Sequence, residues 1–448
     1  MKLLLPLFFV FNYSLFGQVN YESENILLLD NWQDSSLYAN FYSAKYNEVW
    51  GFTRDGVEYA VIGSTEGIHV FKIESNDTLN LIWEDRVTSP SASNVIHRDF
   101  HDLNNYLYAG CAERSWLYRF DLSYLPDSLH RDTVFNLHAI HNLFIDTAAS
   151  VIYLDNDFLG TSSKYEIFPN GDINETSLLD LPFYAHDFFA RNDTLFANCG
   201  HEGLLVIDYN VSTPIYSSLE FYSDKGYNHS GWLSNDGLIY AFADETAGKR
   251  IKICDASDLT DIEVLSMIDI PYYDNLVVHN LLMKDSFLYV SYYEAGLQIF
   301  DISDPSFPQR VAYFDTYQPA NQGSYYGAWG VFPFLTDDKI LVSDMQSGLF
   351  LLKLETDYLI DSSDSQQQCT ISIKNSIVEN DGLLYLSVSN LDFPALGRVY
   401  DMKGSIVSSV LIGTGVNSIS LNEIASGAYI IQFYLNDKIL GIEKFFKK

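Results

Sequence analysis

The sequence predicts an all-β protein built mostly from repeated four-stranded units. Residues Val277–Thr316 contain four short apolar runs, rich in Val, Ile, Tyr, Phe and Leu, which Asp, Gly, Ser and Pro separate. Such runs between turn residues are typical of antiparallel strands. Pro305 and Pro308 fall between the third and fourth runs, where proline removes no ladder hydrogen bond. One such unit cannot bury both of its faces alone, so it predicts neighbours of the same kind.

The neighbours appear as a repeated pattern of one His or Trp, a few apolar residues, a polar turn and an aromatic strand. Its anchor residues are Trp50, His97, His141, His186, His229, His279 and Trp329. Successive anchors are 47, 44, 45, 43, 50 and 50 residues apart, close to the roughly 40–50 residues of a four-stranded propeller blade. Seven anchors therefore predict a seven-bladed β-propeller over residues 25–354. Several third strands end in Asp, as in GLQIFDIS, and we expect these carboxylates to bond nearby backbone amides.

The N-terminal region predicts a signal peptide and a strand that closes the ring of repeats. Residues 1–17 are typical of a secretory signal peptide, because one Lys precedes an apolar run and Gly17 stands before Gln18. The apolar segment Asn25–Trp32 follows. Because the last repeat ends at Leu354 after three strands, we expect this segment to supply its fourth strand and close the ring. No later stretch is long and apolar enough to predict a transmembrane segment.

The net charge limits the class of partner, and the cysteine content limits the possible disulfides. The chain has 26 basic and 59 acidic residues, a formal net charge of −33, which repels phosphate backbones and excludes a nucleic-acid partner. We expect a soluble monomer. The four cysteines are Cys111, Cys199, Cys254 and Cys369. They allow three pairings, among which the sequence does not choose, and the first three are interpreted as small buried residues.

Several ordered motifs resemble a known family. YNEVWGF, EYAVIGSTEGIHVF, HRDFHDLNNYLYAG and GLQIFDISDPSFPQ are similar to the secreted choice-of-anchor B family and its LVIVD-type propeller repeats. The resemblance spans Asn25 to Leu354 and implies export and surface display without implying a reaction. Two places depart from the pattern: KYEIFPNGDIN lacks Gly-Leu-x-Ile-x-Asp, and His97 stands where Trp-Arg-Asp is expected.

A second β module follows a polar, Ser/Gln-rich linker over residues 355–370. We expect residues 371–448 to form a small β-sandwich. They strongly resemble the type A C-terminal sorting domain used with type IX secretion in Bacteroidetes-like bacteria. The candidate sorting-signal residues are Asp401, Gly404, Gly427, Tyr429, Lys444, Lys447 and Lys448. The resemblance implies recognition by the secretion machinery at the outer membrane, removal of the module, and release or surface attachment of the propeller. An ordinary accessory β-domain is the alternative.

The seven anchors are the candidate binding site. Residues at the start of innermost strands can face the central channel, a common place for ligands, and neutral imidazoles can bind metal. The alternative is structural, with each anchor hydrogen-bonded to the neighbouring blade. Five blades spread their His too widely for one tight coordination sphere, so no metal site and no cofactor are predicted, although a divalent metal is not excluded.

No catalytic residue is predicted, because GxSxG, HExxH, P-loop and GxGxxG motifs are absent from the sequence. We therefore expect a secreted or outer-membrane surface protein that binds an extracellular macromolecule or glycan without catalysis. The alternative is a metal-dependent hydrolase or lyase with its site in the propeller channel, since propellers host both kinds of function. Carboxylates converging with the His anchors would favour the enzyme.

Overall fold

The computed structural model describes residues 21–86, 95–113, 116–135, 137, 139–156, 160–210, 215–268, 270, 275–319, 323–355, 370–374, 377–378, 382–389, 395–412, 415–422, 424–435 and 438–448. The chain is all-β with almost no helix, and η2 (Leu122–Tyr124) is a single 3-10 turn. Among the described residues, no helix is long and apolar enough to cross a membrane. The expected signal peptide, nearly all of the expected linker and Cys369 lie outside the described residues.

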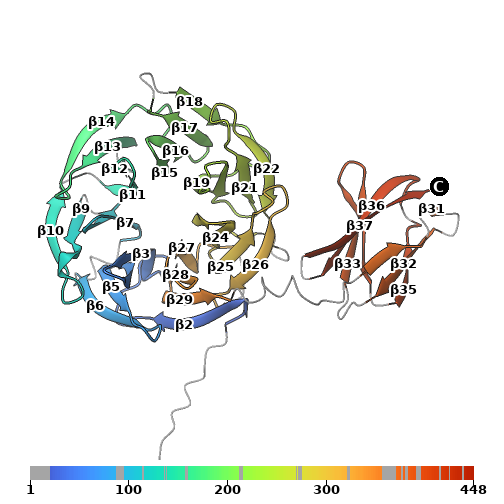
Figure 1. Ribbon diagram of the computed structural model, residues 1–448, viewed down its shortest axis with the longest axis horizontal. Coiled ribbons are helices and arrows are strands. Elements are labelled where there is room, and N and C mark those ends of the chain that lie inside the picture. The colour runs from blue at the N-terminus through green and yellow to red at the C-terminus, as the bar shows by residue number, and fades with distance from the viewer. Residues whose placement is uncertain are drawn as a thin grey trace, which may run out of the picture.

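Antiparallel four-stranded sheets follow one another along the chain and are arranged in a ring (Figure 1). The first holds β3 (Tyr46–Arg54), β4 (Val57–Ser64), β5 (Gly67–Ile73) and β6 (Leu79–Arg86). The second holds β7 (Arg98–Leu103), β8 (Tyr106–Cys111), β9 (Leu117–Asp121) and β10 (His130–Phe135). The third holds β11 (Ile140–Asp146), β12 (Val151–Asn156), β13 (Thr161–Ile167) and β14 (Ile173–Leu179).

The ring continues with sheets of the same order. One holds β15 (Asp187–Arg191), β16 (Thr194–Asn198), β17 (Leu204–Asp208) and β18 (Ile215–Leu219). The next holds β19 (Asn228–Leu233), β20 (Ile239–Asp244), β21 (Ile251–Asp255) and β22 (Glu263–Ile268). In each sheet, sequence neighbours pair as antiparallel hairpins, which short connections allow.

The N-terminal segment pairs with the last two sheets of the ring. β1 (Ser23–Glu24) adds a fifth strand to β23 (Leu281–Lys284), β24 (Phe287–Ser291), β25 (Leu297–Asp301) and β26 (Gln309–Phe314). β2 (Ile26–Trp32) pairs with β29 (Gly348–Leu354), beside β28 (Lys339–Asp344) and β27 (Ala328–Phe332). Figure 1 shows β2, in blue, next to the orange β29. The N-terminal strand thus has the place that the sequence predicts.

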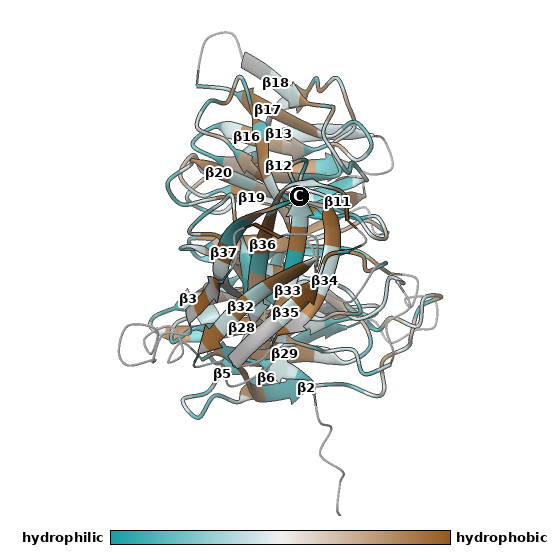
Figure 2. Cartoon of the chain, turned by 90° about the vertical axis from the view of Figure 1, so that its right-hand side faces the viewer, coloured by the Kyte–Doolittle hydropathy of each residue, from teal (hydrophilic) through white to brown (hydrophobic). Residues whose placement is uncertain are grey.

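Burial rises from the outer strands toward the middle of each sheet. β8 and β28 are buried along nearly their whole length, whereas β6 and β14 are largely exposed or half-buried. Strands covered on both faces are continuous apolar runs, because a packed neighbour meets each face. Apolar residues follow the strands, and many connecting loops are hydrophilic (Figure 2). The core of the ring therefore lies between adjacent sheets.

The Asp residues that end third strands bond backbone amides, as the sequence predicts. The Asp301 carboxylate accepts from Ser303 N at 2.8 Å, and Asp255 accepts from Ser257 N at 2.9 Å. Asp121 accepts from Ser123 N in the same way. The repeated acid is therefore a turn feature of the fold.

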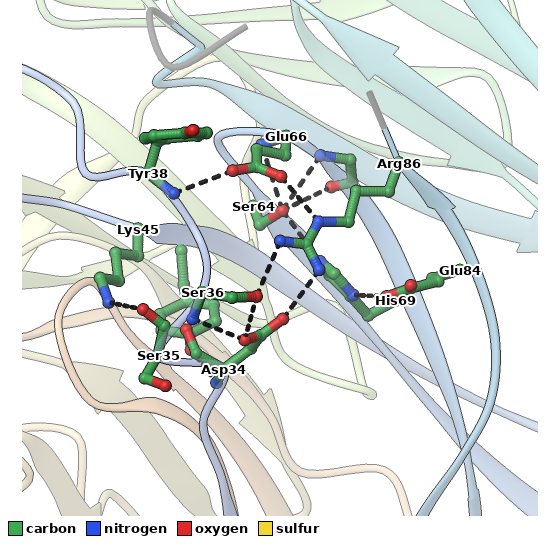
Figure 3. A network of polar contacts seen from close by, with 12 residues as sticks. Asp34, Ser35, Ser36, Tyr38, Lys45, Ser64, Glu66, His69, Glu84 and Arg86 are labelled. Atoms are coloured by element: carbon green, nitrogen blue, oxygen red, sulfur yellow. Dashed lines mark hydrogen bonds and ion pairs between the residues drawn. The ribbon is translucent and has the colours of Figure 1, made fainter. Parts of the chain in front are cut away.

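A polar network joins the segment after β2 to the first sheet (Figure 3). The Arg86 guanidinium donates to Glu66 at 2.6 Å and to Asp34 at 2.9 Å. Glu66 also accepts from Tyr38 N at 2.9 Å. Because Glu66 is buried, pairing with Arg86 offsets the cost of removing its charge from water. The network holds the segment that links the end of the ring to its beginning.

The C-terminal residues form two further sheets. One holds β30 (Thr370–Ile373), β32 (Leu383–Ser389) and β35 (Gly415–Ser420). The other holds β31 (Ile377–Val378), β37 (Lys438–Lys447), β36 (Gly427–Leu435), β33 (Ala395–Asp401) and β34 (Ile406–Ile412). Side chains of both sheets, among them Leu386, Ile419, Ile431 and Phe445, share one apolar core.

Cys111, Cys199 and Cys254 are buried. Burial raises the pKa of the Cys199 thiol to about 12, so it is neutral and unreactive at ordinary pH. These residues pack as small apolar groups, which agrees with the interpretation drawn from the sequence.

Candidate functional site

Some anchors stand at bulges of the innermost strands, as His141, His229 and Trp329 do, and the others, His97, His186 and His279, stand just before such strands. The pairing of β19 with β20 shifts register between Asn228 and Ser230, around His229. That of β27 with β28 shifts between Ala328 and Gly330, around Trp329. A bulge bends the strand and re-aims the side chain of the extra residue.

Six of the seven anchors form a closed ring of side chains, here called the His ring. Its members are His97, His141, His186, His229, His279 and Trp329. Neighbouring ring centroids are 4.5, 4.5, 4.3, 4.4 and 4.4 Å apart in that order, and 5.7 Å separates Trp329 from His97. The sequence analysis expected the His residues of five blades to be widely spread, but their imidazoles lie close together.

Trp50 does not join the His ring. The bulge of β3 lies between Tyr46 and Val49, so Asn47 has the ring position and Trp50 comes three positions later. The indole of Trp50 donates to Asp102 at 2.8 Å and contacts His101, with ring centroids 4.3 Å apart. The motif VWGF matches AWGV by residue type but not by register, which explains the difference from prediction.

Trp50 belongs instead to a second set of rings, here called the aromatic layer. Its members are Trp50, His101, Phe144, Phe189, Trp232, Phe334 and Phe332, each in contact with the next and the last with Trp50. Phe144 and Trp232 come from sheets that are not neighbours, yet their centroids are 5.8 Å apart. Side chains of the aromatic layer therefore meet across the channel.

Between these two sets lies a third, here called the polar layer, which the sequence analysis missed. Its members are Glu48, Asp99, Asn142, Asp187, Ser230 and Asn280, from six different innermost strands or their edges. Asn142 donates to Asp99 at 3.0 Å, and Asn280 donates to Glu48 at 2.9 Å. The available signal is that four of these polar residues directly follow an anchor, beside runs that are otherwise apolar, namely Asn142, Asp187, Ser230 and Asn280.

The three layers line one cavity of about 560 Å³. This is the size of a small-molecule site. Tyr42, Tyr325 and Tyr326 also line it, and Tyr42 and Tyr325 are 51% and 50% exposed. The cavity thus extends from exposed tyrosines, past imidazoles and carboxylates, down to the aromatic layer.

Burial keeps three imidazoles of the His ring neutral by lowering their pKa. It lowers the pKa of His279 to about 3, and it lowers the pKa of His229 and His186 well below the usual value, with the neighbouring imidazoles adding to the effect. His279 Nδ1 donates to the Trp329 carbonyl at 2.5 Å, and His186 Nδ1 donates to the His229 carbonyl at 3.2 Å. These bonds join adjacent sheets, as the structural alternative expects. They also leave the lone pair on Nε2 in both residues.

Burial lowers the pKa of these imidazoles but raises the pKa of carboxyl groups in the polar layer. It raises the pKa of Asp99 to about 7, although the amides of Leu143 and Phe100 donate to it. Burial and the nearby Asp99 raise the pKa of Asp187 well above its usual range. Like charges close together cannot all ionise at low cost, so the polar layer holds protons near neutral pH.

One part of the His ring brings metal-binding groups together. Ligand atoms of His229, Glu245 and His279 all lie within 4.8 Å of one another. Glu245 follows β20 and was not predicted, because no repeated residue type marks its position. Burial raises the pKa of Glu245 to about 7, and the Tyr293 hydroxyl donates to its Oε1 at 2.6 Å.

The candidate sorting residues lie in the C-terminal sheets and stabilise local structure. The Asp401 carboxylate accepts from Lys403 N and Ser405 N, both at 2.9 Å, and Gly404 has a φ of 84° in this turn. Tyr429 donates to the Ala425 carbonyl at 2.8 Å. Lys447 Nζ donates to the Leu421 carbonyl at 2.6 Å. Gly427 lies at the start of β36, Lys444 lies in β37, and Lys448 follows that strand.

Residues 278–316 match the LVIVD repeat model. Solved structures similar to the chain include the virginiamycin B lyase from Staphylococcus aureus, 12% identical over 75% of this chain and 100% of that one, with a TM-score of 0.50. The Cps50 (Swd1) β-propeller domain from Myceliophteria thermophila is 12% identical over 73% and 98%, with a TM-score of 0.53. The ring of sheets is a β-propeller.

A third similar structure, U3-55K, is 9% identical over 74% of this chain and 98% of that one, with a TM-score of 0.51. No protein of curated function matches the sequence. At such low identity the likeness concerns the propeller fold alone, and function must be argued from the site.

Proposed function

We propose that this protein is an exported binding protein whose propeller holds a glycan end in its central cavity without catalysing a reaction. The observation that carries the proposal is the composition of the cavity. Exposed tyrosines at the rim offer faces on which a sugar ring can stack, and the polar layer below offers carboxylates and amides for its hydroxyl groups. An acidic sugar would add a further like charge to carboxyl groups that already share protons, so neutral and amino sugars are the expected ligands.

A glycan array followed by calorimetric titration tests this proposal. We expect neutral or amino-sugar oligomers to bind and sialylated or uronic-acid oligomers not to bind. Tyr325→Ala should weaken binding by about fivefold, because an aromatic contact of this kind contributes about 1 kcal/mol. Phe307→Ala removes an aromatic side chain that is 61% exposed and does not line the cavity, and it serves as the matched control. An array without hits, or equal effects of both substitutions, would reject the proposal.

A metal-dependent hydrolase or lyase is the second candidate, favoured by the raised pKa of Asp99 and Glu245 beside neutral imidazoles. Groups with a pKa near 7 suit general acid–base chemistry. Mass spectrometry of each bound oligosaccharide after prolonged incubation separates the two candidates. Shortened or unsaturated products that disappear in Asp99→Asn would establish the enzyme, and unchanged ligand supports the binding protein.

We propose that the sheets of the ring are seven blades, of which β2 closes the last. The pairing of β2 with β29, together with the spacing of the anchors, supports this count. Deleting the residues up to Trp32 should expose the edge of β29, lower the melting temperature by more than about 10 °C and cause aggregation. A truncated protein with an unchanged melt would reject the closure.

We further propose that residues 371–448 form a β-sandwich that directs export by type IX secretion and is then removed. The resemblance of its motifs to type A sorting domains supports this route, and the shared core of its two sheets suits a module that folds by itself. The mature protein should begin near Gln18 and end near Thr370, released or attached at the cell surface. Intact-mass measurement on surface and medium fractions tests this, and full-length chain retained in the cytoplasm would contradict it.

A further inference from the structure

We propose that His229, Glu245 and His279 bind one divalent transition-metal ion of the Zn²⁺ class at one side of the His ring. The proposal does not require the glycan, since the three ligands all belong to the chain. Two imidazoles and one carboxylate are a frequent ligand set for zinc when a further position stays open.

The distances suit closure around an ion. His229 Nε2 and Glu245 Oε2 are 3.8 Å apart, and all three ligand atoms lie within 4.8 Å of one another. Tetrahedral coordination at about 2.0 Å places ligand atoms roughly 3.3 Å apart. Side-chain movements of about 1 Å would therefore form the site without a change in the backbone.

The surroundings orient two of the three ligands. His279 Nδ1 donates to the Trp329 carbonyl, which fixes the tautomer that presents Nε2 to the ion. Tyr293 donates to Glu245 Oε1, leaving Oε2 to face His229. Metal-binding imidazoles and carboxylates are held by outer hydrogen bonds of this kind.

Two further observations mark the place as more than a packing contact. His229 Nδ1 is buried without a hydrogen-bond partner, so no bond at that nitrogen fixes the tautomer, and Nε2, which faces Glu245, can carry the lone pair. Tyr293 has a φ of 32°, an uncommon conformation for a tyrosine, and its backbone carbonyl accepts from Ala328 N at 2.8 Å. Strained backbone persists where the surroundings hold it, and it clusters at functional sites.

An ion here would have a defined relation to the rest of the cavity. The protein supplies three ligands, and both His229 and Glu245 line the cavity, so the remaining coordination position faces it. Water or an oxygen atom of a channel ligand can occupy that position. A positive ion would also offset the carboxyl groups of the polar layer nearby.

Titration of the metal-depleted full-length chain with ZnCl₂ tests the proposal. We expect one Zn²⁺ per chain by calorimetry, with Ca²⁺ and Mg²⁺ binding far more weakly because they prefer oxygen ligands. Co²⁺ in place of Zn²⁺ should show the visible absorption of a four-coordinate site. Glu245→Gln keeps the size of the side chain and should weaken Zn²⁺ binding by at least about 100-fold.

Glu113→Gln is the matched control. Glu113 accepts from His97 Nδ1 at 2.9 Å, at another position of the same ring, but is not part of the proposed site. It should keep the full Zn²⁺ affinity. Should Glu245→Gln fail to fold, Tyr293→Phe, which removes only the outer hydroxyl, should still weaken binding by about 10–100-fold. Loss of binding in Glu113→Gln, or retention in Glu245→Gln and Tyr293→Phe, would overturn the proposal.

Discussion

The His ring and the aromatic layer line the same cavity, yet they differ in what they contribute. Members of the His ring are polar, and His279 and His186 each bond the neighbouring sheet through Nδ1. Members of the aromatic layer, such as Trp232 and Phe144, meet sheets that are not their neighbours. Both layers therefore join sheets, but the His ring does so through hydrogen bonds that leave lone pairs on Nε2, and the aromatic layer does so through apolar packing. Repeated positions near the axis can thus join the blades by different chemistry at different depths.

The largest effect should come from the aromatic layer. Trp232 contacts Phe144, Phe189 and Phe334 and packs against the cores of several sheets. We expect Trp232→Ala to lower the free energy of unfolding by about 3–5 kcal/mol, because it leaves a large cavity. Urea denaturation measures this. A loss below about 1 kcal/mol would remove the distinction between the two layers.

A pH-dependent effect of intermediate size is expected in the polar layer. The pKa of Asp99 is about 7 in the folded chain and about 3.9 when unfolded. At a pH between these two values, Asp99 keeps its proton in the folded chain and loses it in the unfolded chain. The free energy of unfolding therefore falls as the pH rises through this range, and above about pH 7 it no longer changes because of this group. Asp99→Asn should therefore gain about 2.5 kcal/mol in the free energy of unfolding relative to wild type between pH 5 and pH 8. An equal difference at both pH values would contradict the shift.

Within the His ring, the buried members should matter more than the exposed one. His279→Ala removes the bond to the Trp329 carbonyl and leaves a small cavity, and we expect a loss of about 1–3 kcal/mol in metal-free buffer. The same measurement on His186→Ala, which loses the bond to the His229 carbonyl, should give a similar value. Unchanged melts of both variants would mean that these imidazoles serve a ligand alone.

The smallest effect is expected at His97. Its side chain is 29% exposed and pairs with Glu113, which is also partly exposed. Ion pairs open to water contribute little, so His97→Ala should change the free energy of unfolding by less than about 0.5 kcal/mol. A loss as large as that of His279→Ala would show that the whole ring, and not its buried part, packs the blades.

Much of the fold could be predicted because the repeat is regular. Antiparallel strands, turn-ending Asp residues and the closing place of β2 follow from patterns of residue type. The site was predicted less completely. Trp50 was misplaced because the bulge in β3 changes its register by three residues, and residue type carries no record of a bulge.

Glu245 and Tyr293 were missed for a different reason. Both stand just beyond the ends of inner strands, β20 and β24, where the repeats share no common residue. Their contact with His229 and His279 depends on how adjacent blades pack, and sequence spacing does not report distances between blades.

The pairing of β2 with β29 also determines the order in which this chain can fold. Ile26 is in register with Leu354, so most of the propeller must be synthesised before the two strands can meet. At roughly 5–20 residues per second, this delay is about 15–65 s. During that interval the apolar strand Ile26–Trp32 has no partner and is open to chaperones or to wrong pairing. The first propeller strand to be made is therefore among the last to be secured, and the ring stays open until residues near Leu354 have been synthesised.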